Sequence, residues 1–158
     1  MPAETNRIRQ FQPEDAAACS RIVRACVEMD PLTPLQVKEA LLHVESPAVM
    51  QDRARQFYIA VCMLDATVAG VGGVDLNEIK LLFVAPEHQR QGIGGSLLRH
   101  LEAWIPPALF GDIFVYSSAG AVDFYRSHGY QPGGEHRFSL GSCSMATVFM
   151  TKKISNLL

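Results

Sequence analysis

The sequence predicts an α/β domain in which helices flank a mixed, mostly antiparallel central sheet. Residues 57–63 form a continuous apolar run typical of a central strand, and a second run, rich in glycine, follows over 67–74. Residues 75–78 carry a turn signal, so residues 79–84 are expected to return as a neighbouring antiparallel strand. Segments with apolar residues three or four positions apart stand before and after these strands, which is typical of amphipathic helices.

The N-terminal part is expected to hold a short strand and two helices. Pro13 suits the first turn of a helix, which ends at Asp30-Pro31. Thr33 is then expected to cap a second helix, with Gln36 completing a capping box. Residues 47–56 are polar and carry no clear signal. The expected order up to residue 84 is a strand over 8–11, a helix from 13, a helix from 34 that Ser46-Pro47 ends, and strands over 57–63, 67–74 and 79–84.

A long helix is expected after Gly92, and Pro106-Pro107 stops it. Its inward face is expected to carry Ile93, Leu97, Leu98, Leu101 and Ile105. A short strand follows over 113–116.

Ser118 is placed to cap a fourth helix, and Gly129 is placed to end it. From Tyr130 onward the chain is expected to close with a hairpin that turns at Gly141-Ser142. The last strand alternates at Ala146, Val148 and Met150.

The composition is that of one globular domain over residues 1–158. Apolar residues make up 48% and charged residues 19%, so the chain can bury a sizeable core. A net charge of −2 argues against a nucleic-acid or membrane-surface binder. No secretory signal stands at the N-terminus, and no uncharged apolar run approaches the roughly 20 residues that span a bilayer. The cysteines show no C-x-x-C spacing, so we expect reduced thiols in a cytoplasmic protein.

The most informative stretch runs from Glu78 to Leu98. Within it Gln89, Gly92 and Gly94 form Q-x-x-G-x-G between a strand and a helix. This arrangement puts bare backbone N–H groups at a helix start, where they can hold an anion such as a pyrophosphate. Each glycine costs about 0.8–1.0 kcal/mol against alanine inside a helix, so several in one turn indicate that a ligand needs the space. The alternative is that the glycines only let helix and strand pack closely. The dinucleotide fingerprint G-x-G-x-x-G and the P-loop motif do not occur.

The strand ending LLFVAPEHQRQGIG at 81–94 is followed by a helix, a strand and A-x-x-F-Y-x-x-x-G-Y at 121–130. This combination resembles the GNAT (GCN5-related) N-acetyltransferase family. The resemblance implies the GNAT-like acyl-CoA N-acyltransferase fold and acetyl-CoA as the co-substrate, with backbone amides around its pyrophosphate and the strand end along its pantetheine. Ser118 stands where the family often has Asn. The implied cofactor-binding residues are Leu82, Phe83, Val84, Gln89, Arg90, Gln91, Gly92, Ile93, Gly94, Gly95, Ser96, Ser118 and Tyr125.

Acetyl transfer to an amine requires a neutral nucleophile and a stabilised thiolate. Neutralising an amine of pKa about 10.4 at pH 7 costs roughly 4–5 kcal/mol, which a base or a desolvated pocket must supply. The resemblance implies that Tyr125 is the acid beside the sulfur; on helix spacing alone it is a packed aromatic. Glu78 is the implied base, with Asp75 and His136 as alternatives. Both carboxylates also fit solvated turn residues.

We therefore expect direct attack of a primary amine on acetyl-CoA in a ternary complex. The acceptor is a small-molecule amine or a protein amine, held by residues 14–45, the turn 75–78 and the closing hairpin. The alternative is a non-catalytic acyl-CoA-binding sensor or interaction module. Cys143 has no basic partner and the histidines show no ligand spacing, so neither an acyl-enzyme nor a metal site is expected. The apolar hairpin over 138–154 is expected to pair two copies as a homodimer.

Overall fold

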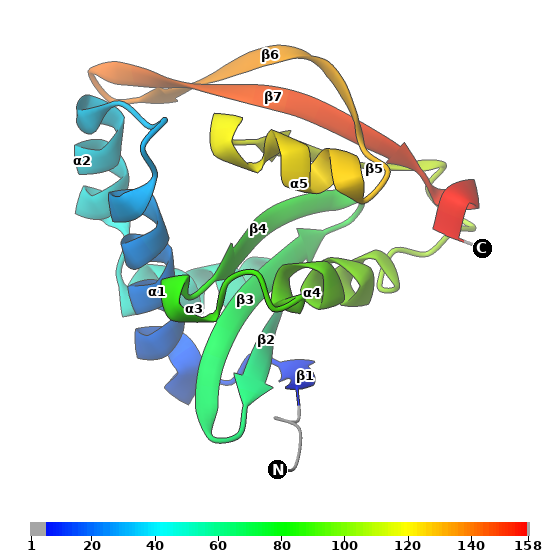
Figure 1. Ribbon diagram of the computed structural model, residues 1–158, viewed down its shortest axis with the longest axis horizontal. Helices are drawn as coiled ribbons and strands as arrows, with labels where there is room; N and C mark the ends of the chain where they lie inside the picture. Colours follow the sequence, from blue (N-terminus) through cyan, green and yellow to red (C-terminus); the bar gives the residue numbers. More distant parts are fainter. Residues whose placement is uncertain (1–5, 158) are drawn as a thin grey trace.

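A computed structural model describes residues 6–157 and shows a seven-stranded sheet with the order β1-β2-β3-β4-β5-β7-β6 (Figure 1). All neighbouring strands are antiparallel except β4 and β5, which are parallel. The prediction of a mixed, mostly antiparallel sheet is therefore confirmed. The strands are β1 (Asn6–Gln10), β2 (Tyr58–Leu64), β3 (Thr67–Asp75), β4 (Glu78–Val84), β5 (Asp112–Ser117), β6 (Gln131–Leu140) and β7 (Cys143–Lys153).

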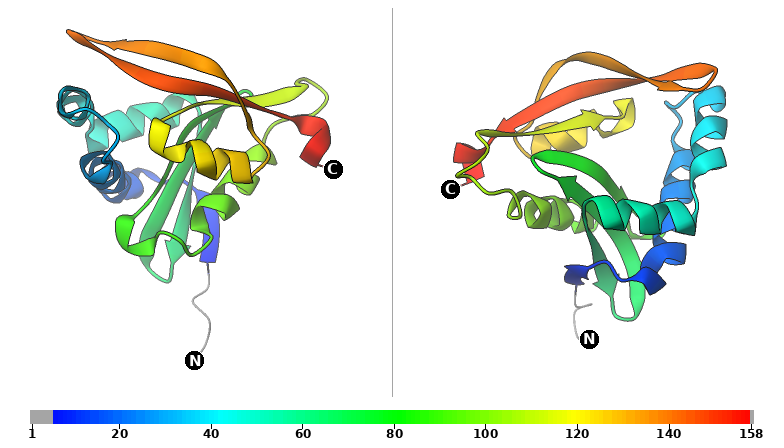
Figure 2. Two further views of the ribbon diagram at one scale, coloured as in Figure 1. Left: turned by 45° about the horizontal axis from the view of Figure 1, so that its top comes forward. Right: turned by 180° about the vertical axis from the view of Figure 1, so that it is seen from behind.

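Helices cover both faces of the sheet. One face packs against α1 (Ala16–Met29) and α3 (Pro47–Gln56), and the other against α4 (Ile93–Glu102) and α5 (Val122–Ser127). In Figure 1, α4 and α5 lie in front of the strands. In the view from behind in Figure 2, α3 lies in front of them instead. The remaining helix, α2 (Leu35–Val44), contacts β6 and β7. Short 3₁₀ turns connect these elements over Pro13–Asp15, Pro86–His88, Ala119–Ala121 and Ile154–Leu157.

The N-terminal half departs from the sequence analysis at two places: one segment for which no element was predicted, and one predicted helix cap that was wrong. Residues 47–56, which carried no clear signal, form α3, because the Ser46 hydroxyl oxygen accepts from the Val49 N–H at 3.2 Å and Pro47 stands in the first turn. Thr33 does not cap α2. Pro34 occupies the N-cap position, and the Thr33 hydroxyl instead donates to the Asp30 carboxylate at 2.7 Å.

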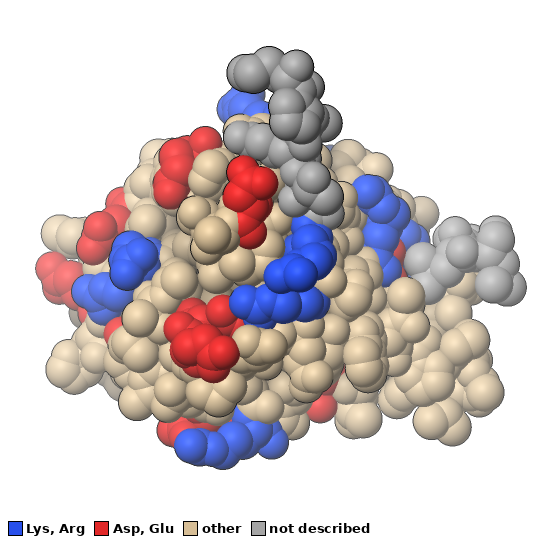
Figure 3. Space-filling view, turned by 90° about the horizontal axis from the view of Figure 1, so that it is seen from below, with Lys and Arg blue, Asp and Glu red and all other residues tan. Residues whose placement is uncertain are grey.

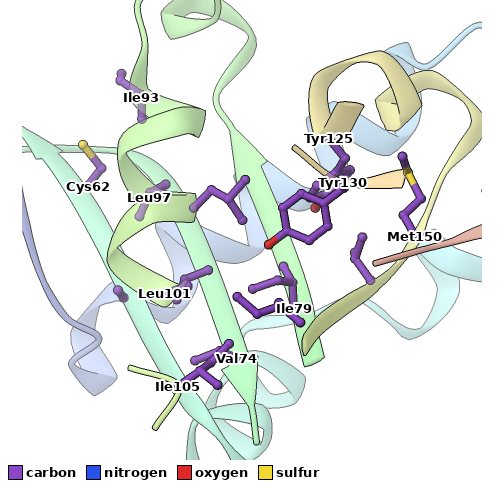
Figure 4. Close-up of a cluster of buried hydrophobic side chains, with 14 of the residues drawn as sticks. Cys62, Val74, Ile79, Ile93, Leu97, Leu101, Ile105, Tyr125, Tyr130 and Met150 are labelled. Carbon is purple, nitrogen blue, oxygen red and sulfur yellow. The ribbon is translucent and has the colours of Figure 1, made fainter. Parts of the chain in front are cut away.

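The core lies in two clusters, one on each side of the sheet. The five residues predicted to turn inward after Gly92 are all buried. Four lie on α4, which packs against β2, β3 and β4, whereas Ile105 lies beyond the end of α4, because the helix ends at Glu102 and not at the predicted Pro106-Pro107. Figure 4 shows Ile93, Leu97, Leu101 and Ile105 in this cluster. Tyr130 lies in the same cluster, and its hydroxyl donates to Glu102 Oε2 at 2.8 Å. Lys152 Nζ lies 3.1 Å from the same oxygen. A buried ion pair therefore joins α4 to β7.

The closing hairpin is more exposed to solvent than the other strands of the sheet. Residues 131–139 of β6 are all exposed, and Phe138 retains 39% of its surface. The hairpin turns at Gly141-Ser142 as predicted, but Ala146 is exposed while Met150 is fully buried. On the face seen in Figure 3, acidic and basic side chains are interspersed instead of gathered by sign. Among residues 6–157 no helix combines the length and the apolar character needed to cross a bilayer.

Candidate active site

The parallel strands β4 and β5 share only two register pairs, Glu78 with Phe114 and Ile79 with Val115, although each strand is longer. Register with β3 runs from Ile79 directly to Leu81, so Lys80 is the extra residue of a β-bulge at this point. Beyond these pairs the two strands have no shared ladder. The sheet therefore opens where β4 continues toward Val84.

A cavity of about 500 Å³ occupies this opening. Its walls come from residues 79–83 of β4 and 115–117 of β5, together with α1, the end of α2, α3 and α5. Four of the predicted site residues line it: Leu82, Phe83, Ser118 and Tyr125. The volume lies in the range typical of small-molecule sites. A further hollow between α2 and the hairpin tip contains none of the predicted site residues.

The predicted anion turn follows β4 directly. Arg90 and Gly92 adopt positive φ values of 64° and 84°, and α4 begins immediately after at Ile93. None of the backbone N–H groups of residues 90–95 donates a hydrogen bond to another described residue; the first regular bond runs from Ser96 N–H to the Gly92 carbonyl. The left-handed residues and the helix start thus leave a run of free N–H donors at the positive end of α4. This is the local structure that the glycine pattern predicts.

Two side chains, one from the turn and one from α1, donate to the backbone carbonyl at the end of β4. Gln89 turns back toward the sheet, and its Nε2 donates to the Val84 carbonyl at 3.1 Å. The Cys26 thiol from α1 donates to the same carbonyl, also at 3.1 Å. Because Cys26 lines the cavity, this contact joins the turn to the cavity wall. Both lone pairs of the Val84 carbonyl are engaged, so a pantetheine group that uses this oxygen has to displace one donor. Burial raises the pKa of Cys26 to about 11, which keeps the thiol protonated and a donor.

The other turn residues lie at the surface or in the first turn of α4. Gln91 is exposed, whereas Ile93, the first residue of α4, is buried in the core. Arg99 lies 3.4 Å from the Ser96 hydroxyl. A Cβ added at Gly94 would meet the Phe124 ring at 3.2 Å, and one at Gly95 would meet His128 Nε2 at 2.9 Å. These two glycines therefore also allow α4 and α5 to pack closely, so both readings of the glycine cluster have support.

Tyr125 is buried in the wall of the cavity, with 5% of its surface exposed. Its ring meets the rings of Phe124 and Tyr130 edge to face, at centroid distances of 5.1 and 5.4 Å. Tyr125 and Tyr130 are labelled in Figure 4. No hydrogen bond joins its hydroxyl to another described residue, which contrasts with the partnered hydroxyl of Tyr130. Burial raises the pKa of Tyr125 above its ordinary value of 10.0, so the hydroxyl remains a proton donor across the neutral range.

Ser118 also lines the cavity, but it does not cap the helix with its side chain. It stands at the N-cap of the 3₁₀ turn Ala119–Ala121, makes no side-chain cap bond, and α5 begins only at Val122. The predicted cap was therefore wrong, because a 3₁₀ turn separates Ser118 from the α-helix. Gly129 ends α5 at a φ of 91°, as predicted.

Two of the three candidate bases are neighbours at the turn between β3 and β4, and the third lies on β6. Glu78 begins β4 at the closed end of the opening, outside the cavity lining, with Oε2 3.7 Å from Lys80 Nζ. Asp75 pairs with Glu78 across the turn. His136 is exposed on β6, and its ring lies 4.9 Å from the ring of Tyr116. Lys80, the ion-pair partner of Glu78, does line the cavity.

The sequence analysis did not single out three charged cavity residues, Asp30, Glu45 and Arg53, although the first two lie within the range 14–45 that was expected to hold the acceptor. Glu45 is buried at the junction of α2 and α3, and Arg53 lies on α3. The Ser-Pro pair that starts α3 is a helix N-terminus signal that would have placed both. Within residues 6–157 no group of three or more His, Cys, Asp or Glu side chains is arranged to hold a metal ion.

Comparison with known proteins points to one family. The profile of the Acetyltransferase (GNAT) domain matches residues 28–148. A GCN5-related N-acetyltransferase structure from Rhodopseudomonas palustris has a TM-score of 0.86 at 23% identity and covers 97% of this chain and 98% of its own. The paia N-acetyltransferase of Thermoplasma acidophilum, solved with coenzyme A, has a TM-score of 0.71 at 18% identity over 94% and 99%. The Salmonella typhimurium protein yncA, solved with acetyl-CoA, has a TM-score of 0.68 at 16% identity over 95% and 94%. No curated protein matches in sequence.

Proposed function

Because this chain belongs to the GNAT acetyltransferase family, we propose that it moves the acetyl group of acetyl-CoA to a primary amine by direct attack in a ternary complex. The observation that carries the proposal is the run of free N–H groups at residues 90–95, beside a cavity that Tyr125 lines. A diphosphate held at the start of α4 would direct the rest of the coenzyme along β4 into the opening. The two structures solved with coenzyme A or acetyl-CoA share this fold.

The donor is held mainly by backbone. The N–H groups of residues 90–95 donate to the diphosphate oxygens, and the positive end of α4 adds favourable electrostatics of about 0.3–1 kcal/mol. Arg90, exposed beside these groups, adds a cationic side chain. Leu82 and Phe83 flank the thioester end inside the cavity. Ser118, on the opposite wall, offers its hydroxyl to the pantetheine arm.

The reaction moves two protons. The neutral amine nitrogen attacks the thioester carbon, the carbon–sulfur bond breaks, and the departing thiolate takes a proton from the Tyr125 hydroxyl. The amine gives up one proton to a base, and Tyr125 is reprotonated from solvent. Glu78 is the proposed base, acting through water because it does not line the cavity itself. A positioned acid or base typically contributes about 10²–10⁴-fold to such a step.

The test is to measure binding and turnover together. Calorimetry with acetyl-CoA, NAD and ATP is expected to show association with acetyl-CoA alone. Release of coenzyme A, followed with a thiol reagent across a panel of primary amines, is expected to depend on the amine. Binding without release for any amine would leave the non-catalytic acyl-CoA-binding module as the function. Absence of acetyl-CoA binding would overturn both.

A further inference from the structure

Glu45 carries an unsatisfied carboxylate oxygen in the wall of the active-site cavity. Its side chain is 5% exposed, and its Oε1 accepts from Arg53 Nη1 at 2.8 Å. Its Oε2 is buried and accepts no hydrogen bond from any described residue. Leaving a charged acceptor buried without a partner is costly, and native proteins seldom do so without a functional reason.

The other charged side chains that line the cavity already face partners. Asp30 accepts from the Leu32 N–H at 2.9 Å and from the Thr33 hydroxyl at 2.7 Å, one bond to each oxygen. Lys80 lies 3.7 Å from Glu78, and Arg53 is the partner of Glu45. Among the described residues, Glu45 Oε2 is therefore the charged oxygen of this cavity that still requires a donor.

Glu45 and Tyr125 belong to opposite faces of the sheet. Glu45 follows α2 and pairs with α3, on the face that α1 and α3 cover, whereas Tyr125 comes from α5 on the other face. The cavity passes between β4 and β5 and touches both residues. An elongated acceptor in this cavity therefore has one end near Tyr125 and the other end near Glu45.

We propose that Glu45 anchors a second, non-reacting cationic nitrogen of the acceptor, so that the acceptor class is an amine with a further positive charge. This inference rests on the proposed acetyl transfer. A carboxylate beside an ammonium group stabilises its protonated form, and a protonated nitrogen cannot attack the thioester. The nitrogen held by Glu45 is thus not the one that is acetylated. Because Oε2 is covered by protein, the carboxylate turns toward the cavity on binding while Oε1 keeps Arg53.

The test compares pairs of acceptors that differ only in charge. Each pair has one primary amine on an alkyl chain of given length, ending either in a dimethylamino group, which is cationic and cannot be acetylated to a stable amide, or in the isosteric neutral isopropyl group. For at least one chain length the wild-type kcat/KM for the dimethylamino compound is expected to exceed that of its partner about 10–100-fold, mainly through KM. Glu45→Gln is expected to abolish this preference, because kcat/KM for the dimethylamino compound falls to about that of its isopropyl partner.

Asp52→Asn is the matched control, because Asp52 also pairs with an arginine of α3 but is exposed and lies outside the cavity. It is expected to keep the preference for the charged acceptor. A wild-type enzyme that shows no preference at any chain length overturns the inference even if Glu45→Gln fails to fold. Equal loss with both members of a pair in Glu45→Gln also overturns it, because that result indicates a purely structural ion pair. Turnover with neutral-tailed amines alone leaves the acetyltransferase proposal standing; no turnover with any amine removes both.

Discussion

The two sides of the opening between β4 and β5 differ in the groups that form them: backbone N–H groups on one side and side chains on the other. The proposed donor side is made of backbone: free N–H groups of residues 90–95, fixed by left-handed turn residues and a helix start. The proposed acceptor side is made of side chains from α1, α2, α3 and β7, which are distant in sequence. A short continuous segment can therefore set the donor site, whereas the acceptor site depends on the whole fold.

A buried ion pair also anchors the donor side. Its helix α4 is tied to β7 by the buried Glu102, which holds both Tyr130 and Lys152. The side chains of Glu102 and Lys152 are 4% and 12% exposed. Along β6, by contrast, residues 131–139 are exposed. Variants on the two sides should therefore differ in which property they change.

The largest effect is expected for Lys152→Met, which removes the cation from the buried carboxylate of Glu102. Breaking a buried pair from one side costs about 3–5 kcal/mol, because the remaining charge is left in a poorly solvated place. Denaturant unfolding of the purified variant measures this loss. Lys153→Met is the control, since Lys153 is exposed at the next position and should change stability by less than about 0.5 kcal/mol. Equal losses in the two variants would show that the ion pair does not fasten α4.

Tyr125→Phe separates catalysis from stability on the same side. We expect kcat to fall by about 10²-fold or more, with little change in the KM for acetyl-CoA, because a general acid is lost. Stability should be nearly unchanged, since the hydroxyl has no partner among the described residues. Steady-state kinetics and thermal melts measure the two properties.

Tyr130→Phe should show the reverse pattern. Its hydroxyl donates to a buried carboxylate, so its loss should cost about 1.5–3 kcal/mol of stability and leave the chemical step largely intact in the folded fraction. If Tyr125→Phe keeps the wild-type kcat across the pH range, the assignment of the acid is wrong.

Gly92→Ala tests the backbone of the donor turn alone. A Cβ at Gly92 meets nothing within 4 Å, so the only penalty is its φ of 84°, which costs a non-glycine residue about 1–2 kcal/mol. Because relaxing this strain moves the N–H groups, we expect weaker binding of acetyl-CoA by calorimetry and an unchanged KM for the amine. Gly111→Ala is the control, since its Cβ also meets nothing within 4 Å and its φ is not in the left-handed region. An unchanged affinity in Gly92→Ala would argue against the turn as the diphosphate site.

The difference between a continuous backbone segment and contacts of distant side chains also determined what the sequence could predict. Gln89, Gly92 and Gly94 are local, so their pattern identified the donor turn and the helix after it. Glu45 and Arg53 meet across the link between α2 and α3. The helix-start signal at Ser46-Pro47 places both residues on neighbouring elements, but it does not show that their side chains pair or that they line a cavity. The engagement of the Val84 carbonyl by Cys26 is likewise a contact between distant segments. Thr33 shows that a local prediction can also fail. Its hydroxyl donates to the Asp30 carboxylate and does not accept a hydrogen bond from a backbone N–H at the start of α2.

The smallest expected effect is a loss of stability in mild acid that begins on the donor side. His128 packs against Phe124 at 4.6 Å between ring centroids, its Nε2 is buried without a partner among the described residues, and burial lowers its pKa below the ordinary value of 6.5. The unfolded chain therefore binds a proton more readily, so the stabilising contribution is complete above about pH 6.5 and is lost as the pH falls toward the lower folded pKa. His100 has a pKa lowered by burial in the same direction, whereas the lowered pKa of Asp15 acts only below its ordinary 3.8. Unfolding free energies measured from about pH 7.5 to 5.5 should fall for the wild type and fall less for His128→Leu. The exposed His43, replaced by Gln, should leave the wild-type slope in place; an identical slope in His128→Leu would place the acid sensitivity elsewhere than between α4 and α5.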